Sequence, residues 1–180
     1  MSKTTLLRKQ KGMTMIEMGL VIIIGVVLTV IGLRWYQSTR NDTRLQSEVS
    51  EMTRTMAKIT DAYQAAPDFT GLTTAVAIGN NVFPTDKVNG ARTAVLNNYN
   101  GAVTVAPATL VNANDSAALT AGAYDRDACA QLPNKLAGVM RRIDVNGTTV
   151  KPDGGAVDPS LVSNACLANA NQLTYYGSKS

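Results

Sequence analysis

The feature that most constrains this chain is an apolar run near its start. Residues Met13–Leu33 read MTMIEMGLVIIIGVVLTVIGL, and Glu17 is the one charged residue among them. These 21 residues would extend about 31 Å as an α-helix, which is enough to cross the hydrocarbon core of a bilayer. The sequence therefore predicts a membrane-spanning helix that carries one acidic side chain.

The charges in front of this run predict its orientation. Four basic residues and no acidic ones precede it, and they account for the whole net charge of +4: Lys3, Arg8, Lys9 and Lys11. By the positive-inside rule the N-terminus stays in the cytoplasm and the remainder is exported. The basic residues therefore form a membrane flank, and we expect no nucleic-acid partner.

Glu17 decides between the possible kinds of membrane segment. A cleaved secretory signal would need a shorter run and a small-residue cleavage site, whereas Arg34, Trp35 and Tyr36 follow here. A plain signal anchor leaves Glu17 unexplained, because an acid within an apolar helix costs up to about 3 kcal/mol. Glu17 could reach the near interface, or it could lie at the positive end of the helix dipole. Either position would lower that cost but would not explain why the chain has a charge there.

The order of residues gives Glu17 a sharper interpretation. A leader ending at Gly12 would leave a new amine at Met13, and Glu17 would be the fifth residue from it. Amine and carboxylate would then pair, within one chain or between neighbours. Pairing between chains would fix the axial register of helices packed side by side.

The helix is predicted to continue beyond the apolar run, over 13–66. No proline occurs before Pro67, and an apolar stripe with alternating spacings of four and three follows: Leu45, Val49, Met52, Met56, Ile59 and Tyr63. The residues between them suit a solvated face: Ser47, Glu48, Glu51, Arg54, Lys58 and Asp61. The stripe would pack on the chain's own head, and a short coiled coil is the alternative.

The segment KG followed by MTMIEM and GLVIIIGVVLTVIGL resembles the class III signal of type IV prepilins. The resemblance implies that a prepilin peptidase cuts after Gly12 and methylates the amine of Met13, and that Glu17 supports subunit docking in the filament. A Met at the first mature position resembles type IVb pilins, although a leader of twelve residues is short for them.

Two cysteines and no histidine limit the chemistry of the rest of the chain. His-based triads and His metal sites are excluded. In an exported head Cys129 and Cys166 should form a disulfide, and two buried free thiols are the alternative. The pattern ACAQL, IDVNGTTV and NACLANANQLTYY resembles the heads of type IVb pilins from conjugative thin pili and enteric adhesive pili, in which a disulfide closes the C-terminal region.

Several segments of the head have a predicted structure. Residues 70–78 form a short helix or strand, 101–106 a strand, 125–141 a helix with Pro133 breaking or kinking it, and 173–176 a closing strand. Asn146-Gly147 between 142–145 and 148–151 predicts a hairpin with a type I′ turn. Five aspartates could form a carboxylate pair or a calcium loop, but their spacing favours solvated loop charge: Asp125, Asp127, Asp144, Asp153 and Asp158.

Together these observations predict an α+β fold, a long N-terminal helix packed on an antiparallel β-sheet head. The regions are a leader 1–12, a helix 13–66 with its membrane part 13–33, and a head 67–180 with a disulfide-closed region 129–166. The resemblance implies a structural pilus subunit, without cofactor, metal or catalytic residues, that supports adhesion, aggregation or conjugative contact.

The partners implied are other copies of the chain, the prepilin peptidase, the assembly platform with its ATPase, and the inner membrane before export into an extracellular pilus. A pseudopilin or minor pilin is the first alternative. A membrane-anchored exported enzyme is the second, and the absence of histidine counts against it.

Overall fold

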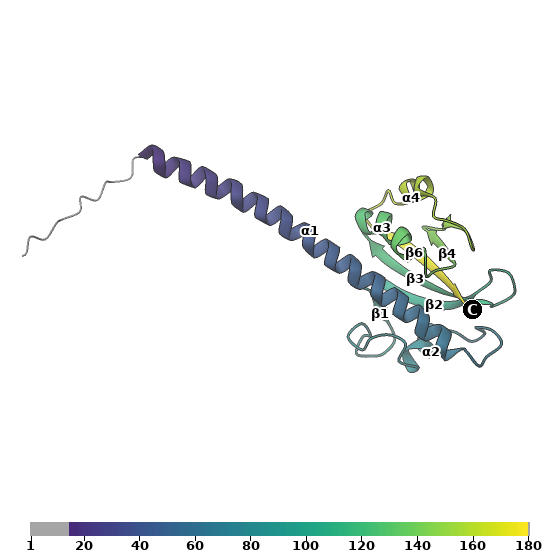
Figure 1. The fold of residues 1–180 in the computed structure, drawn as a ribbon. Helices are drawn as coiled ribbons and strands as arrows, with labels where there is room; N and C mark the ends of the chain where they lie inside the picture. Colours follow the sequence, from purple (N-terminus) through teal and green to yellow (C-terminus); the bar gives the residue numbers. More distant parts are fainter. Residues whose placement is uncertain (1–14, 180) are drawn as a thin grey trace, which may run out of the picture. The chain divides into compact units, whose positions relative to one another are not determined.

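The computed structural model describes residues 15–179, and the chain divides into two compact units, Met1–Asp42 and Thr43–Ser180. Helix α1 (Met15–Ala62) supplies all of the described structure in the first unit and enters the second (Figure 1). Two threonine hydroxyls in its first unit donate to carbonyls one turn earlier, Thr29 to Gly25 and Thr39 to Trp35. Such bonds satisfy hydroxyls within the helix itself.

The second unit is built on a six-stranded sheet in the order β1-β2-β3-β6-β4-β5, with every neighbouring pair antiparallel. This confirms the predicted antiparallel head. The strands are β1 (Val95–Leu96), β2 (Ala102–Ala108), β3 (Ser116–Tyr124), β4 (Arg142–Val145), β5 (Thr148–Lys151) and β6 (Asn171–Ser178).

One face of this sheet forms the core. Alternate residues of the central strands point into it and are buried, among them Val105, Leu119, Leu173 and Tyr175. The second part of α1 packs closely there, because a Cβ on Gly177 of β6 would overlap the sulfur of Met56. The absence of a side chain at Gly177 therefore lets helix and sheet approach.

Three short helices complete the head: α2 (Thr74–Gly79), α3 (Arg126–Leu136) and α4 (Pro159–Ala165). Each helix begins after a capping residue whose side chain accepts a hydrogen bond from a backbone N–H of the first turn. The capping residues are Thr73, Asp125 and Asp158 respectively. The segment 70–78 thus contains a helix. The helix expected over 125–141 ends at Leu136, and Pro133 lies inside it without breaking it.

Other boundaries differ from the prediction as well. Helix α1 ends at Ala62 rather than at 66, and Tyr63 begins a series of turns by donating to the carbonyls of Ile59 and Thr60. The sequence did not predict β1, β3 or α4. Strand β3 reads SAALTAGAY, and its alanines have low strand propensity. Their small size suits a sheet face closely covered by a helix.

The predicted hairpin is confirmed. Strands β4 and β5 pair around Asn146 and Gly147, which have φ angles of 49° and 83°. Both angles are positive, as a type I′ turn requires.

Candidate functional site

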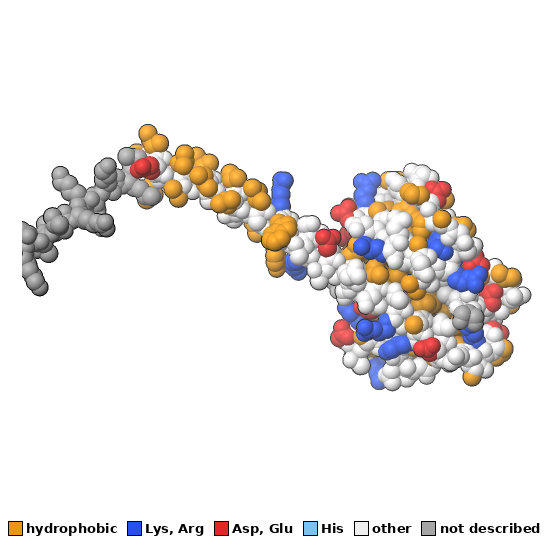
Figure 2. All heavy atoms as spheres, in the orientation of Figure 1, with side chains coloured by type: hydrophobic (Ala, Val, Ile, Leu, Met, Phe, Trp, Pro, Cys, Tyr) orange, Lys and Arg blue, Asp and Glu red, His pale blue; other side chains and the backbone are white. Residues whose placement is uncertain are grey.

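The first candidate site is the apolar surface of α1. Every large apolar side chain from Met15 to Leu33 is exposed, between 94% at Met15 and 48% at Val30. Figure 2 shows hydrophobic side chains gathered along this part of the helix. By length and composition α1 could cross a membrane. A helix that is apolar on all sides requires lipid or protein around it.

Glu17 lies in the first turn of α1, and its side chain is exposed. A carboxylate in this position interacts favourably with the positive end of the helix dipole. Gly12 and Met13 lie outside the described residues, so the predicted cleavage and methylation remain predictions. The docking role of Glu17 also remains a prediction.

The second part of α1 forms a buried interface with the head. Four members of the predicted stripe are buried, Leu45, Met52, Met56 and Ile59, and the two others, Val49 and Tyr63, are partly buried against the core. The prediction that Glu48 belongs to the solvated face was wrong, because Glu48 is fully buried.

Glu48 is buried because the head supplies hydrogen-bond donors to both of its carboxylate oxygens. The hydroxyl of Tyr124 donates to Oε1 at 2.5 Å. The backbone N–H and the side-chain amide of Asn98 donate to Oε2 at 3.1 and 2.9 Å. A buried carboxylate is stable only when its oxygens are satisfied in this way.

Asn98 connects this carboxylate to its surroundings. Its side-chain amide also donates to Glu51 at 3.0 Å, and its side-chain oxygen accepts from Lys87 at 2.6 Å. Its backbone carbonyl accepts from Nε of Arg44 at 2.7 Å. One loop residue thus holds three side chains of α1, and together they fix the rotation of the helix on the head.

The neighbouring residue, Asn97, holds the loop itself. Its buried side-chain oxygen accepts from the backbone N–H groups of Tyr99 and Gly101, at 2.9 and 2.7 Å. Its amide donates at 2.8 Å to the carbonyl of Gly122, next to a bulge where the register of β3 shifts between Ala121 and Tyr124. This bulge lies immediately before Tyr124, which donates to Glu48.

Burial changes the acidity of several groups around Glu48. Desolvation, followed by repulsion from Asp125, raises the pKa of Tyr99 to about 12. Desolvation also raises the pKa of Tyr124 and of Tyr175 well above the usual range. The pKa of Glu51 is raised, first by burial and next by the charge of Glu48. These three tyrosines therefore remain neutral at physiological pH.

Aromatic contacts complete the cluster. The rings of Tyr99 and Tyr124 meet edge to face with their centroids 5.2 Å apart. The guanidinium of Arg44 lies 4.0 Å from the centroid of Tyr99, in a cation–π contact. Sequence reasoning missed Asn97 and Asn98, because the stretch VLNNYNG indicates only a turn. It missed Tyr124 because that residue ends β3, a strand that was not predicted.

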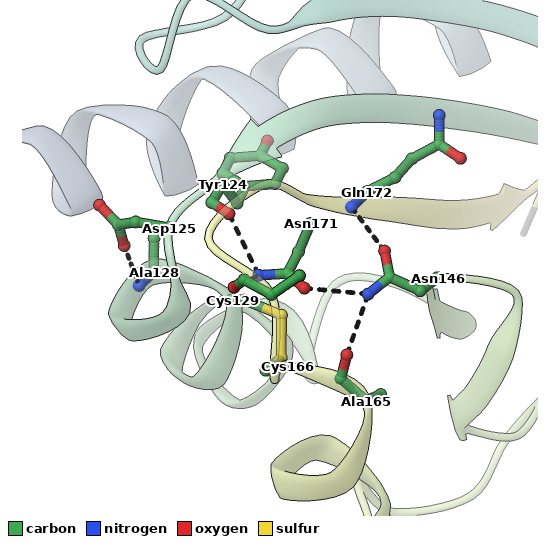
Figure 3. Close-up of a disulfide and its surroundings, with 10 residues drawn as sticks. Tyr124, Asp125, Ala128, Cys129, Asn146, Ala165, Cys166, Asn171 and Gln172 are labelled. Atoms are coloured by element: carbon green, nitrogen blue, oxygen red, sulfur yellow. Dashed lines mark hydrogen bonds between the residues drawn. A yellow bond between two sulfur atoms is a disulfide. The ribbon is translucent and has the colours of Figure 1, made fainter.

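The predicted disulfide is present and closes the C-terminal region. Cys129 of α3 and Cys166, which caps α4, are joined with their Cα atoms 5.7 Å apart. Figure 3 shows that two asparagines beside it bind the surrounding loops. Asn146 of the hairpin donates to the carbonyl of Ala165 and to the side chain of Asn171, both at 2.9 Å. The hairpin turn is thereby fixed to the disulfide-closed loop.

Four of the five aspartates considered for a carboxylate or calcium site serve local structure, and the fifth, Asp127, is exposed in the first turn of α3. Asp125 and Asp158 cap helices. Asp144 and Asp153 accept paired hydrogen bonds from Arg142 and Arg141 respectively. Within residues 15–179, no group of three or more His, Cys, Asp or Glu side chains is arranged to hold a metal ion.

Comparisons with known proteins agree with this architecture. The chain is 22% identical to the major structural subunit of bundle-forming pilus from Escherichia coli O127:H6, over 93% of this chain and 94% of that protein. The same subunit from Escherichia coli O111:H- is 21% identical over the same shares.

Solved structures share the fold. The type IVb pilin from Salmonella typhi matches with a TM-score of 0.56 and 18% identity, over 75% of this chain and 99% of that one. TcpA, a type IV pilin from Vibrio cholerae El Tor, matches with a TM-score of 0.55 and 14% identity, over 76% and 99%. The family described as PilS N terminal matches residues 40–178. The chain belongs to this family of type IV pilins.

Proposed function

We propose that this chain is the structural subunit of a type IVb-like pilus filament. The observation that carries the proposal is the division of α1 by its side-chain environment. Its second part is buried against the head, whereas its first part exposes an apolar surface on all sides. Such a subunit is stable alone only within a membrane, and it becomes stable outside one when the apolar helices of many copies pack together.

Processing would convert the membrane-held form into the assembling form. A prepilin peptidase would cut after Gly12 on the cytoplasmic side and methylate the amine of Met13. The support for this step is the sequence order, basic leader, Gly12 and then Glu17 five residues into the apolar run. Before assembly the N-terminus lies in the cytoplasm and the head outside the inner membrane, as the basic flank favours.

Assembly would then be directed by a pair of charges. In an apolar surrounding, the carboxylate of Glu17 gains most from an opposite charge, and the amine of Met13 on a neighbouring copy would supply it. This pairing would fix the axial register of each added subunit. The assembly platform and its ATPase would move subunits out of the inner membrane into the extracellular filament.

A major subunit is favoured over a minor pilin or pseudopilin. Both Escherichia coli relatives are described as major structural subunits, and both match this chain nearly end to end. Abundance distinguishes the candidates, because a major subunit must dominate the filaments sheared from cells.

The experiment is an intact-mass measurement of the sheared surface fraction, with and without reductant. We expect an abundant species that lacks Met1–Gly12, carries one extra methyl group and gains two hydrogens on reduction. The matched control is Gly12→Val, which should leave the full-length chain in the membrane with its disulfide intact. A full-length wild-type chain found in the membrane alone would contradict the proposal.

A further inference from the structure

The aromatic residues of this chain are distributed very unevenly. The sequence has nine, one Trp, six Tyr and two Phe. Seven of them lie in the second unit, where each is buried or partly buried. The other two, Trp35 and Tyr36, are adjacent on α1 and exposed by 77% and 59%. Large aromatic side chains this exposed indicate a surface that contacts something else.

Their position coincides with a change of polarity along α1. No charged residue occurs from Met18 to Leu33, and the residues that follow include Arg34, Arg40 and Asp42. The guanidinium of Arg40 lies 5.8 Å from the centroid of the Tyr36 ring. An aromatic pair flanked by cations is typical of the boundary between lipid headgroups and acyl chains.

The spacing along the helix fits the same boundary. Trp35 lies 18 residues after Glu17, a rise of about 27 Å, which is close to the thickness of a bilayer's hydrocarbon core. Glu17 would reach one interface while Trp35 reaches the other. Because adjacent residues point about 100° apart around a helix, Trp35 and Tyr36 would contact lipid on two sides.

We propose that Trp35 and Tyr36 bind the headgroup boundary on the exported side of the bilayer and so set the depth of the membrane-held subunit. This inference rests on the membrane-held stage of the proposed function. Each ring buries its apolar body among the acyl chains while the indole N–H or the phenol hydroxyl faces the headgroups. The same contacts must be released when the subunit enters a filament.

The chain's single tryptophan provides a direct test. The full chain is reconstituted at a low protein-to-lipid ratio in vesicles of zwitterionic and anionic phospholipid. Trp35 fluorescence is then quenched by lipids brominated near the carbonyl end or near the methyl end of the acyl chain, and by aqueous iodide. We expect the bromines near the carbonyl end to quench Trp35 most.

Two matched variants calibrate the depth scale. Leu28→Trp with Trp35→Tyr moves the fluorophore about 10 Å towards the bilayer centre, and Thr39→Trp with Trp35→Tyr moves it about 6 Å towards water. The first should respond most to the bromines near the methyl end, and the second to iodide. Quenching of Trp35 that matches either variant would overturn the inference.

A second copy of the chain is the competing occupant of this surface. Trp35 that is shielded from both lipid bromines and iodide even at the low protein-to-lipid ratio, with emission at short wavelength, would indicate that a second copy covers it and would overturn the inference. Failure of the membrane-held stage has a different signature, because Trp35 and the tryptophans placed at positions 28 and 39 would then all respond to iodide alone. Filaments from a chain whose Trp35 is not quenched by lipid would contradict the inference and leave the pilus function standing.

Discussion

The two parts of α1 each carry a glutamate among apolar residues, and they differ in what surrounds them. Around Glu17 the apolar side chains are exposed, and around Glu48 they are buried against the head. Glu48 accepts three hydrogen bonds from the chain's own Tyr124 and Asn98. The first part is apolar on all sides and exposed, whereas the second part carries an apolar stripe that the head buries.

This difference separates assembly from folding. The second part belongs to the core of the head, so changes there should alter the free energy of unfolding. The first part lies outside that core, so changes there should alter assembly and leave the head's stability unchanged.

The largest effect is expected for Glu17→Ala. Without the carboxylate no charge pair fixes the register of an added subunit, so we expect sheared filaments to fall below detection. The head should unfold at the same temperature as wild type, and the leader should still be removed. The measurement is filament yield together with the intact mass of the membrane-held chain.

Ile23→Ala is the matched control for Glu17→Ala, because it also shortens an exposed side chain of the apolar run but leaves the charge. Its filament yield should stay near that of wild type. Wild-type yield from Glu17→Ala would refute the docking role, and an unstable head would refute the division between the two parts of the helix.

Removal of the disulfide should have the largest effect on the head. The bond joins residues separated by 37 positions, and the chain-entropy model gives about 4 kcal/mol for a loop of this length. Cys129→Ser with Cys166→Ser should therefore lower the free energy of unfolding by about that amount. Denaturant unfolding in detergent measures it, and reduced wild type should match the double variant. An unchanged denaturant midpoint would show that the hydrogen bonds of Asn146 and Asn171 suffice to hold the loop between Cys129 and Cys166.

Glu48→Ala should destabilise the head by about 3 kcal/mol. The substitution leaves the buried hydroxyl of Tyr124 and the backbone N–H of Asn98 without their acceptor, which costs more than the bonds themselves contribute. Glu48→Gln keeps an acceptor and should cost about 1 kcal/mol. Equal free energies of unfolding for wild type, Glu48→Ala and Glu48→Gln would show that the hydrogen bonds to Glu48 do not hold α1 on the head.

The sequence predicted what depends on local pattern and missed what depends on tertiary contact. The apolar stripe, the Asn146-Gly147 hairpin and the disulfide all have one-dimensional signals, and the structure contains them. Strand β3 does not have such a signal, because its alanines have low strand propensity and the strand is fixed by its pairing with β2 and β6. The buried state of Glu48 depends on Asn98 and Tyr124, which are 50 and 76 residues away.

Alkaline pH should weaken the contacts that Tyr99 makes beside Glu48. Because the folded pKa of Tyr99 is about 12 against an ordinary value of 10, folding favours the neutral phenol. That stabilisation is complete below pH 10 and is lost as pH rises towards 12. We expect tyrosinate absorbance and loss of helical signal to rise together in this window, and Tyr99→Phe to make the loss of stability less steep. Ionisation of every tyrosine near pH 10 in a folded chain would contradict this account.

The smallest effect should come from Glu51→Gln. The pKa of Glu51 is raised above 4.5, first by burial and next by Glu48, while Lys87 at 3.9 Å opposes the rise. A raised pKa means that the stabilisation from the protonated form is present below pH 4.5 and is lost as pH increases through the folded value.

The uncharged variant should therefore be more stable than wild type at neutral pH, by less than about 1 kcal/mol because the site is partly exposed. The advantage should vanish below pH 4, where Glu51 is protonated in both states, and denaturant unfolding at the two pH values measures this. Because the Glu51→Gln variant retains an acceptor for Asn98, the comparison isolates the charge. A variant less stable than wild type at neutral pH would mean that the attraction between Lys87 and the Glu51 carboxylate outweighs the combined effects of burial and of Glu48.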